Sequence, residues 1–200
     1  MSKSLYLECR SGISGDMTVA ALLDLGADRE VLEKSLESLK LPGYEIAITR
    51  VKKSGLDACD FNVILDAEHE NHDHDMAWLY GNEAAVEHTH EHEHCHEHDH
   101  EDHHHAHHHH HRSLADVTTI IDGSQMSNGA KRRALAIFSV LAAAEAKAHG
   151  KTPDTVMFHE VGAVDSIVDV CSVAICLDDL GIEDIVVESL SEGHGTIRCA

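Results

Sequence analysis

The side chains with the clearest potential for chemistry are histidines, most of which lie in one stretch of the chain. Residues 68–111 hold 18 of the 21 histidines and 12 of the 36 acidic residues, and they contain no Lys or Arg. Neutral imidazole nitrogens beside carboxylates bind borderline divalent cations such as nickel, copper, zinc and cobalt. The stretch is therefore predicted to bind metal, although its composition does not identify which metal.

The predicted metal ligands of this stretch are its closely spaced histidines. They are His88, His90, His92, His94, His96, His98, His100, His103, His104, His105, His107, His108, His109, His110 and His111. Such a polar composition cannot bury a core, so we expect a disordered insert. A purification tag is disfavoured because tags sit at termini. A solvated spacer that never meets metal is the remaining alternative.

A second group of reactive side chains lies near the far end of the chain. His159 and Glu160 end a strand-like segment, Asp165 opens a helical stretch, and Asp169 follows four residues later on the same helix face. Asp169 stands among Ile, Val, Ala and Cys, where a carboxylate needs a partner or a metal. Together with Asp16, these four are predicted to be catalytic, binding a divalent ion or supplying acid–base groups.

Structural roles for the same residues stay open from spacing alone. Asp165 could serve only as a helix N-cap. Asp169 could pair with a buried arginine such as Arg10, or with His159, as a structural bond. These alternatives predict a buried ion pair in place of a site.

A glycine- and serine-rich turn precedes Asp16. Ser11, Gly12, Ser14 and Gly15 lie between a strand-like segment and a helical one, where backbone N–H groups can cradle an anion. We predict that they are cofactor-binding residues that hold an anionic group. The spacing is not that of a Walker loop, and Asp16 would repel a phosphate unless a cation bridged them. The alternative is a tight strand-to-helix turn in which Asp16 is a helix-start residue.

The elements that must position these residues alternate between strands and helices. Strands are predicted over residues 5–9, 44–49, 59–65, 155–159, 185–189 and 196–199, and helices over 17–25, 28–39, 114–123, 127–148 and 165–180. This order favours an α/β fold, a mixed sheet with packed helices. One discontinuous domain is expected, residues 1–67 plus 113–200, interrupted by the histidine-rich insert at 68–112.

Charge and cysteine usage indicate which partners and which cellular compartment to expect. The chain has 15 basic and 36 acidic residues, a net charge of −21, which argues against nucleic acid and anionic membranes as partners. The chain shows no signal peptide and no apolar run long enough to span a membrane. Six cysteines without a C-x-x-C pair are expected as free thiols in a cytoplasmic protein.

Two sequence motifs and the insert together resemble a known family. Residues 5–17 read LYLECRSGISGDM and residues 158–169 read FHEVGAVDSIVD. With the histidine-rich insert, they are similar to the LarC family of nickel-insertion proteins. The resemblance implies a CTP-dependent cyclometallase of the lyase class. Such an enzyme places Ni(II) into pyridinium-3,5-bisthiocarboxylic acid mononucleotide, forming nickel–sulfur and nickel–carbon bonds, and so completes the cofactor of lactate racemase and related enzymes.

The same resemblance sets expectations for cofactors and partners. In the family, CTP and its Mg or Mn ion belong to a separate C-terminal domain, so we expect this chain to be the N-terminal portion. It is expected to act with a C-terminal half or a second subunit, with the recipient racemase or epimerase as a further partner, and to form a homo-oligomer.

The alternative function is non-catalytic nickel storage or delivery through the insert. A storage protein has no use for a buried pair of carboxylates. Convergence of Asp16, His159, Glu160, Asp165 and Asp169 in space would therefore favour the enzyme.

Overall fold

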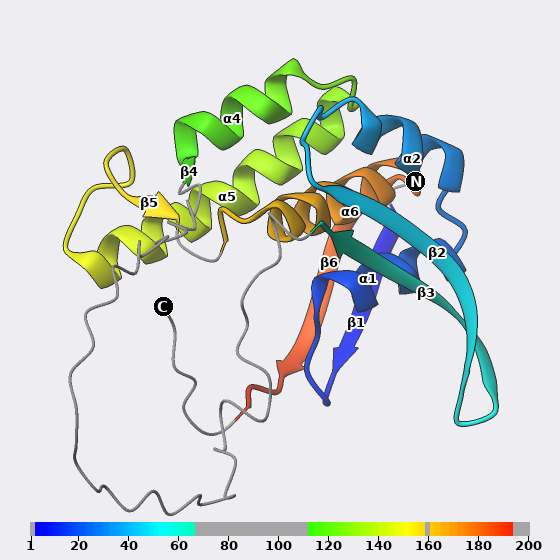
Figure 1. The fold of residues 1–200 in the computed structure, drawn as a ribbon. Helices are drawn as coiled ribbons and strands as arrows, with labels where there is room; N and C mark the ends of the chain where they lie inside the picture. The colour runs from blue at the N-terminus through cyan, green and yellow to red at the C-terminus, as the bar shows by residue number, and fades with distance from the viewer. Residues whose placement is uncertain (1–2, 67–111, 159–160, 194–200) are drawn as a thin grey trace, which may run out of the picture. The chain divides into compact units, whose positions relative to one another are not determined.

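The computed structural model describes residues 3–66, 112–158 and 161–193 (Figure 1). Its helices are α1 (Gly15–Asp24), α2 (Arg29–Glu37), α4 (Leu114–Gly123), α5 (Asn128–His149) and α6 (Val164–Asp179). Its strands are β1 (Lys3–Cys9), β2 (Tyr44–Lys53), β3 (Leu56–Leu65), β4 (Arg112–Ser113), β5 (Met157–Phe158) and β6 (Ile182–Leu190). The expected α/β class is confirmed.

The strands of the described residues form three small ladders. Strand β1 pairs in parallel with β6, β2 pairs antiparallel with β3, and β4 pairs antiparallel with β5. The β2–β3 hairpin turns at Ser54 and Gly55, which have φ values of 52° and 83°. Two positive φ values suit the tight turns that match the twist of the flanking strands. The strands predicted over 44–49 and 59–65 lie within the two segments that form this hairpin.

Helix α6 is the centre of the core. Its residues are buried on most sides, and α1, α2 and α5 all pack against it. Phe138 of α5 and Phe158 of β5 are both fully buried, with ring centroids 6.0 Å apart, so the strand before α6 is held against α5. This burial agrees with the mostly apolar composition of the helix predicted over residues 165–180.

Most helix ends follow their sequence signals. The Asp28 carboxylate accepts hydrogen bonds from the backbone N–H groups at the start of α2, and the Ser127 hydroxyl accepts one from Ala130. Gly150 ends α5 in the left-handed conformation. Helices α1 and α6 differ, because no backbone N–H group in their first turns donates to the side chain of the N-cap residue. Their first turns therefore keep backbone N–H groups available.

Several predictions fall outside this description. The 15 predicted histidine ligands, the insert as a whole and the strand predicted at 196–199 lie beyond the described residues. The chain is described again from Arg112, the last residue assigned to the insert, which lies in β4. None of the helices in the described ranges combines the length and apolar character that a membrane crossing needs.

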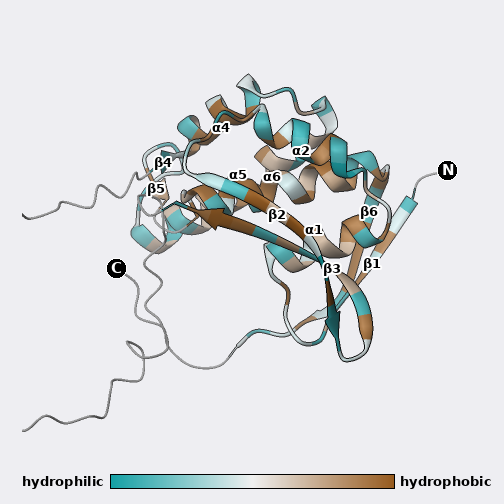
Figure 2. Ribbon diagram, turned by 45° about the vertical axis from the view of Figure 1, so that its right-hand side comes forward, coloured by the Kyte–Doolittle hydropathy of each residue, from teal (hydrophilic) through white to brown (hydrophobic). Residues whose placement is uncertain are grey.

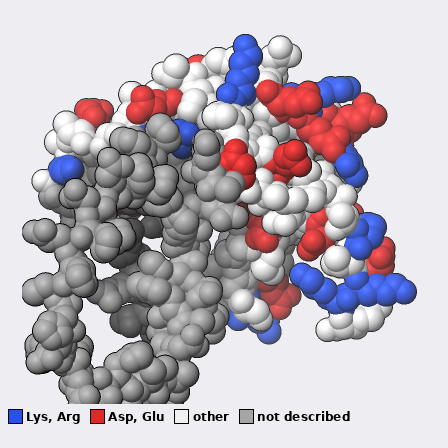
Figure 3. Space-filling model, in the orientation of Figure 1, with Lys and Arg blue, Asp and Glu red and all other residues white. Residues whose placement is uncertain are grey.

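Charged side chains show no single sign over the face drawn in Figure 3. Acidic and basic residues are interspersed over α2 and the β2–β3 hairpin. On α2 they form ion pairs one turn apart, Arg29 with Glu33 and Lys34 with Glu30. Such exposed pairs contribute little to stability. They also leave no continuous basic surface among the described residues on this face.

Candidate functional site

The first turn of α1 meets the second turn of α6 at Gly15 and Asp169. The two helices pack against each other. A β-carbon added to Gly15 would lie 2.1 Å from Oδ2 of Asp169 and 2.7 Å from its Cβ. The Asp169 side chain therefore packs directly against the backbone of Gly15, and only a glycine leaves it that room.

Three of the predicted catalytic carboxylates are brought together here. Burial, together with the nearby negative charges of Asp16 and Asp165, raises the pKa of Asp169 to about 6. Carboxylates affect one another in this way only when they lie close together with little water between them. Asp16 comes from α1, whereas the other two come from α6, so the cluster depends on the packing of these helices.

Buried oxygen atoms without partners mark the face of α6 that carries these carboxylates. Oδ1 of Asp165, Oδ1 of Asp169 and Oγ of Ser172 are all buried and have no hydrogen-bond partner within residues 3–66, 112–158 and 161–193. The three residues are spaced by four and three positions, so they lie on one stripe of the helix. Leaving a buried polar atom unpaired costs about 1–3 kcal/mol. Such a cost is commonly found where a ligand or ion satisfies the group.

Two of the structural alternatives for these aspartates differ from what the fold contains. Helix α6 begins at Val164 with Ala163 as its N-cap, so Asp165 is the second helical residue and not a cap. Arg10 is exposed and pairs with Glu8 at 2.9 Å, so it is not a buried partner of Asp169. The predicted His159 and Glu160 lie outside the described residues, as does the alternative pairing of Asp169 with His159.

The glycine–serine turn is confirmed as the link between β1 and α1. Gly12 adopts a φ of 87° and its N–H donates to the carbonyl of Cys9, which makes a tight turn. The Ser14 hydroxyl donates to Asp16 Oδ1 at 2.5 Å. An anion at this helix end would meet the carboxylates of Asp16 and Asp169. The predicted binding residues Ser11, Gly12, Ser14 and Gly15 therefore fit an anionic ligand only together with a bridging cation.

The carboxylates do not form a complete metal site by themselves. Among residues 3–66, 112–158 and 161–193, no three His, Cys, Asp or Glu side chains are grouped closely enough to hold a metal ion. The cluster instead offers a partial set of oxygen ligands. Additional donors would have to come from a bound molecule or from other parts of the chain.

The segment before α6 is anchored by Arg112. Strand β4 pairs with β5, with Arg112 opposite Phe158. The Arg112 guanidinium also donates from Nη1 to the carbonyl of Gly162 at 2.6 Å, and burial lowers its pKa. A β-carbon on Gly162 would lie 2.9 Å from Cβ of Phe158. Sequence reasoning missed this anchor because it assigned Arg112 to the insert.

Ser172 was also missed, although a signal was present. It is a lone polar residue in an apolar helix, seven positions after Asp165 and three after Asp169. This spacing places it on the helix face already singled out by the two aspartates. The predicted site thus extends one turn further into the core than the two motifs indicate.

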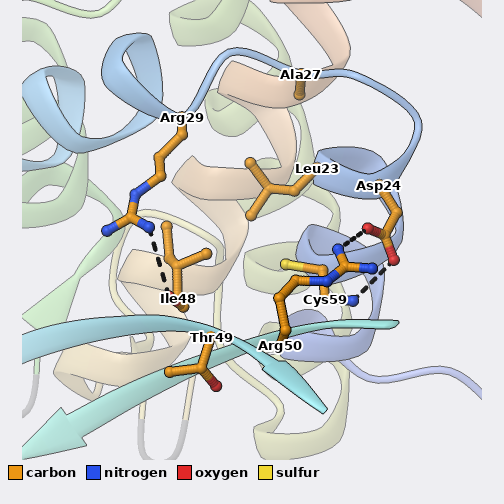
Figure 4. A pocket seen from close by; sticks show the side chains of 8 residues that line it. All are labelled: Leu23, Asp24, Ala27, Arg29, Ile48, Thr49, Arg50 and Cys59. Carbon is orange, nitrogen blue, oxygen red and sulfur yellow. Dashed lines mark hydrogen bonds and ion pairs between the residues drawn. The ribbon is translucent and has the colours of Figure 1, made fainter. Parts of the chain in front are cut away.

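A hollow of about 380 Å³ lies apart from this cluster, between the end of α1, the turn into α2 and the β2–β3 hairpin (Figure 4). The Arg50 guanidinium is ion-paired with Asp24 and Asp57, and the Asp24 carboxylate also accepts from the Cys59 N–H. Burial raises the pKa of the Cys59 thiol. No predicted site residue lines the hollow, whose walls are Leu23, Asp24, Ala27, Arg29, Ile48, Thr49, Arg50 and Cys59.

Comparison with known proteins identifies the family of this chain. Residues 5–200 match the family described as "Nickel insertion protein". The chain belongs to the nickel insertion protein family. The LarC resemblance of the two sequence motifs is thereby confirmed. The carboxylate cluster is formed by these motifs, since Asp16 lies in the first and the other two aspartates lie in the second.

Curated relatives in this family carry a specific name. A protein of Alkaliphilus metalliredigens named "Pyridinium-3,5-bisthiocarboxylic acid mononucleotide nickel insertion protein" is 52% identical over 200 residues, covering 100% of this chain and 42% of its own length. Relatives with the same name from Clostridium acetobutylicum and Geobacillus kaustophilus are 48% and 41% identical, covering 98% and 99% of this chain and 45% and 41% of their own lengths. The chain thus spans less than half the length of these relatives. No solved structure matches it.

Proposed function

We propose that this chain is the N-terminal part of a CTP-dependent nickel insertase, acting on pyridinium-3,5-bisthiocarboxylic acid mononucleotide. The observation that carries the proposal is the cluster of Asp16, Asp165 and Asp169, with buried carboxylate oxygens that lack partners. The family and the names of the relatives support the substrate. Nickel is the ion that is inserted, so it is a substrate here.

The chemistry of the substrate indicates what the carboxylates would do. Thiocarboxylate groups on ring positions 3 and 5 flank the carbon at position 4, and nickel held by both sulfurs lies over that carbon. Forming the nickel–carbon bond breaks the carbon–hydrogen bond, whose electron pair goes to nickel while the proton goes to a base. A carboxylate with a pKa of about 6 is mostly ionised at neutral pH and accepts a proton more readily than an ordinary one. We assign this role to Asp169.

The other two carboxylates would attract and bind the metal ion. Asp16 and Asp165 place negative charge beside Asp169, which attracts a divalent cation and offers oxygen ligands for a site that nickel occupies in transit. The cation in turn allows the nucleotide phosphate or a thiocarboxylate to approach the N-terminal ends of α1 and α6, where free backbone N–H groups favour anions. His159 and Glu160 remain predicted members of this site.

The remaining parts of the reaction are assigned to other regions and partners. The carboxylate-lined end of α1 does not suit a triphosphate, so we place CTP with its Mg or Mn ion in a C-terminal portion or second subunit. The histidine-rich insert would collect nickel in the cytoplasm. The recipient racemase or epimerase and a second copy of the chain remain predicted partners.

The storage alternative is less well supported. A protein that only stores nickel through its insert gains nothing from buried, partnerless carboxylates in the folded part. Asp16, Asp165 and Asp169 lie close enough to act on one another, and they come from two helices distant in sequence. We therefore favour the insertase and use the storage function as an outcome of the test.

Nickel insertion in a reconstituted system tests the proposal. The full chain is incubated with the precursor nucleotide, Ni(II), CTP, Mg or Mn and a supplied C-terminal portion, and the nickel-containing nucleotide is measured by mass spectrometry. Asp169→Asn keeps the shape and removes the charge, so it should abolish product formation. Asp122→Asn, at an exposed position on α4, is the matched control and should retain wild-type yield.

Two results would contradict the proposal. A folded Asp169→Asn variant with full yield would remove Asp169 from the reaction. Equal nickel uptake by wild-type and variant chains, with no product from either in the complete system, would support nickel storage instead.

A further inference from the structure

Strand β6 leaves most of its apolar surface uncovered within the described part of the chain. Ile185, Val186 and Val187 are 46%, 52% and 46% exposed, and Leu190 is 55% exposed. These residues form the hydrophobic middle and end of the strand (Figure 2). In the described residues β6 pairs only with β1, so its other edge has no strand partner.

Exposed apolar side chains of β6 lie on both faces of its ladder with β1. In a parallel ladder, paired residues point to the same side of the sheet. Leu5 and Ile185 are paired, and Leu5 packs against the buried core, so Ile185 lies on the helix side. Val186, paired with Tyr6, lies on the opposite side. The helices therefore do not extend far enough to cover β6, and its outer face is open as well.

Such an arrangement is unusual for parallel strands. Parallel sheets occur almost only where both faces are covered, and two strands alone are marginal. An exposed apolar edge strand also invites pairing with another chain. Within the described residues, the exposed row on β6 is therefore an uncovered apolar sheet edge, to which a further strand can pair.

Charge distinguishes between the candidate polypeptides. Strand β6 carries Glu183, Asp184 and Glu188 and no basic residue, and the whole chain has a net charge of −21. A second copy would place like charges against each other along the edge, which is unfavourable. The relatives offer another occupant, since more than half of the Alkaliphilus protein lies outside the region that this chain matches.

We infer that β6 is the docking edge for the portion of nickel insertion proteins that this chain does not contain. The partner would add a strand along the free edge of β6, with apolar residues against Ile185–Val187 and basic residues facing Glu183 and Asp184. This inference rests on the proposed function, in which a further portion is needed for turnover. It names the surface through which that portion is held.

Binding measured without any nickel chemistry tests the inference. The full chain is co-expressed with the part of the Alkaliphilus protein outside the matched region, and the complex is quantified by size-exclusion chromatography with light scattering. Wild-type chain should form a one-to-one complex. Val186→Asp should weaken it by about tenfold or more. Val140→Asp, at a 70% exposed position on α5, is the matched control and should bind like the wild type.

Two further measurements keep the test independent of folding. Glu183→Lys changes only an exposed charge, so it should weaken binding while the melting temperature stays that of the wild type. Hydrogen exchange of the wild-type chain should slow in peptides covering β6 when the partner is present. Absence of a complex, a complex unaffected by Val186→Asp and Glu183→Lys, or a homodimer protected at β6 would each overturn the inference. Insertion activity plays no part in these outcomes.

Discussion

The side chain of Asp169 occupies the space that a β-carbon on Gly15 would need. The carboxylate oxygen Oδ2 would be only 2.1 Å from such an atom. The glycine at the first position of α1 is thus required for close packing against α6, and this packing holds Asp169 beside Asp16. A residue predicted to cradle an anion thus also sets the position of the carboxylate cluster.

Gly15→Ala should therefore destabilise the protein. Alanine is a better helix former than glycine, so at an open helical position the change would be neutral or favourable. Here the added methyl group forces α1 and α6 apart, at a cost of about 1–3 kcal/mol. Thermal and urea denaturation should show the loss. Gly123→Ala in α4, where nothing lies within 4 Å of the new atom, is the control, and an equal effect of both would contradict the packing explanation.

Asp169→Asn should raise the melting temperature at neutral pH. The pKa of Asp169 is raised from 3.8 to about 6 in the folded protein, so the folded state binds this proton more tightly than the unfolded state. The resulting stability is present below the unfolded pKa and is lost as pH rises through about 6. The Asn variant does not lose this stability. Its melting temperature should therefore be higher than that of the wild type above about pH 6 and equal to it near pH 4. Melting curves across this range that show a less stable variant would indicate an unseen cationic partner.

Asp116→Asn should have the opposite effect. Hydrogen bonds from the Ser113 hydroxyl and backbone N–H lower the pKa of Asp116, as part of a capping box at the start of α4. The stabilisation is present above the ordinary pKa of an aspartate and is lost as pH falls below it. The variant should melt below the wild type at neutral pH, with the difference shrinking in acid. A constant difference at all pH values would exclude the charged hydrogen bonds as its cause.

Deleting residues 68–111 and joining the ends with a short Gly/Ser linker should leave the folded part intact. A polar insert contributes no apolar core, and loop length costs little. Circular dichroism should show unchanged helix content, while equilibrium dialysis should show the loss of most bound nickel. A variant that unfolds, or that keeps the wild-type nickel stoichiometry, would contradict this expectation.

Nickel held by the histidines should be released in mild acid. Imidazole nitrogens protonate near an ordinary pKa of about 6.5, and protons then compete with the metal. Loading measured by dialysis should fall steeply between about pH 7.5 and 5.5. The deletion variant provides the baseline. Loading that stays flat would indicate carboxylate or thiolate ligands instead.

Local sequence signals predicted the elements well, whereas pairing between distant segments was harder to predict. The caps at Asp28 and Ser127 and the stop at Gly150 depend only on neighbouring residues, and the helices predicted at 28–39 and 127–148 are confirmed as α2 and α5. The parallel pairing of β1 with β6 joins segments more than 170 residues apart, as with Leu5 and Ile185, and no local signal encodes it. The strand predicted at 155–159 is described only as Met157–Phe158, because it pairs with just two residues.

In the candidate site, too, the sequence predicted local features better than contacts between distant segments. The meeting of Asp16 with the second motif could be predicted, since each motif follows a strand and opens a helix, and ligand sites in α/β folds gather at such ends. The close contact between Gly15 and Asp169 could not be predicted, because it depends on how closely two helices approach each other. Ser172 lay on the predicted helix face, but an isolated serine carries no chemical signature.

The two-residue ladder of β4 and β5 determines how the histidine-rich stretch is joined to the folded chain. Arg112 follows His111 directly, pairs with Phe158 and binds the carbonyl of Gly162, three residues before Asp165. Under the proposed function, the metal reservoir and its destination are covalently joined at a fixed attachment point. Transfer within one molecule is first-order, so its rate does not change when the protein is diluted. Free nickel then need not accumulate in solution for the insertion step to proceed.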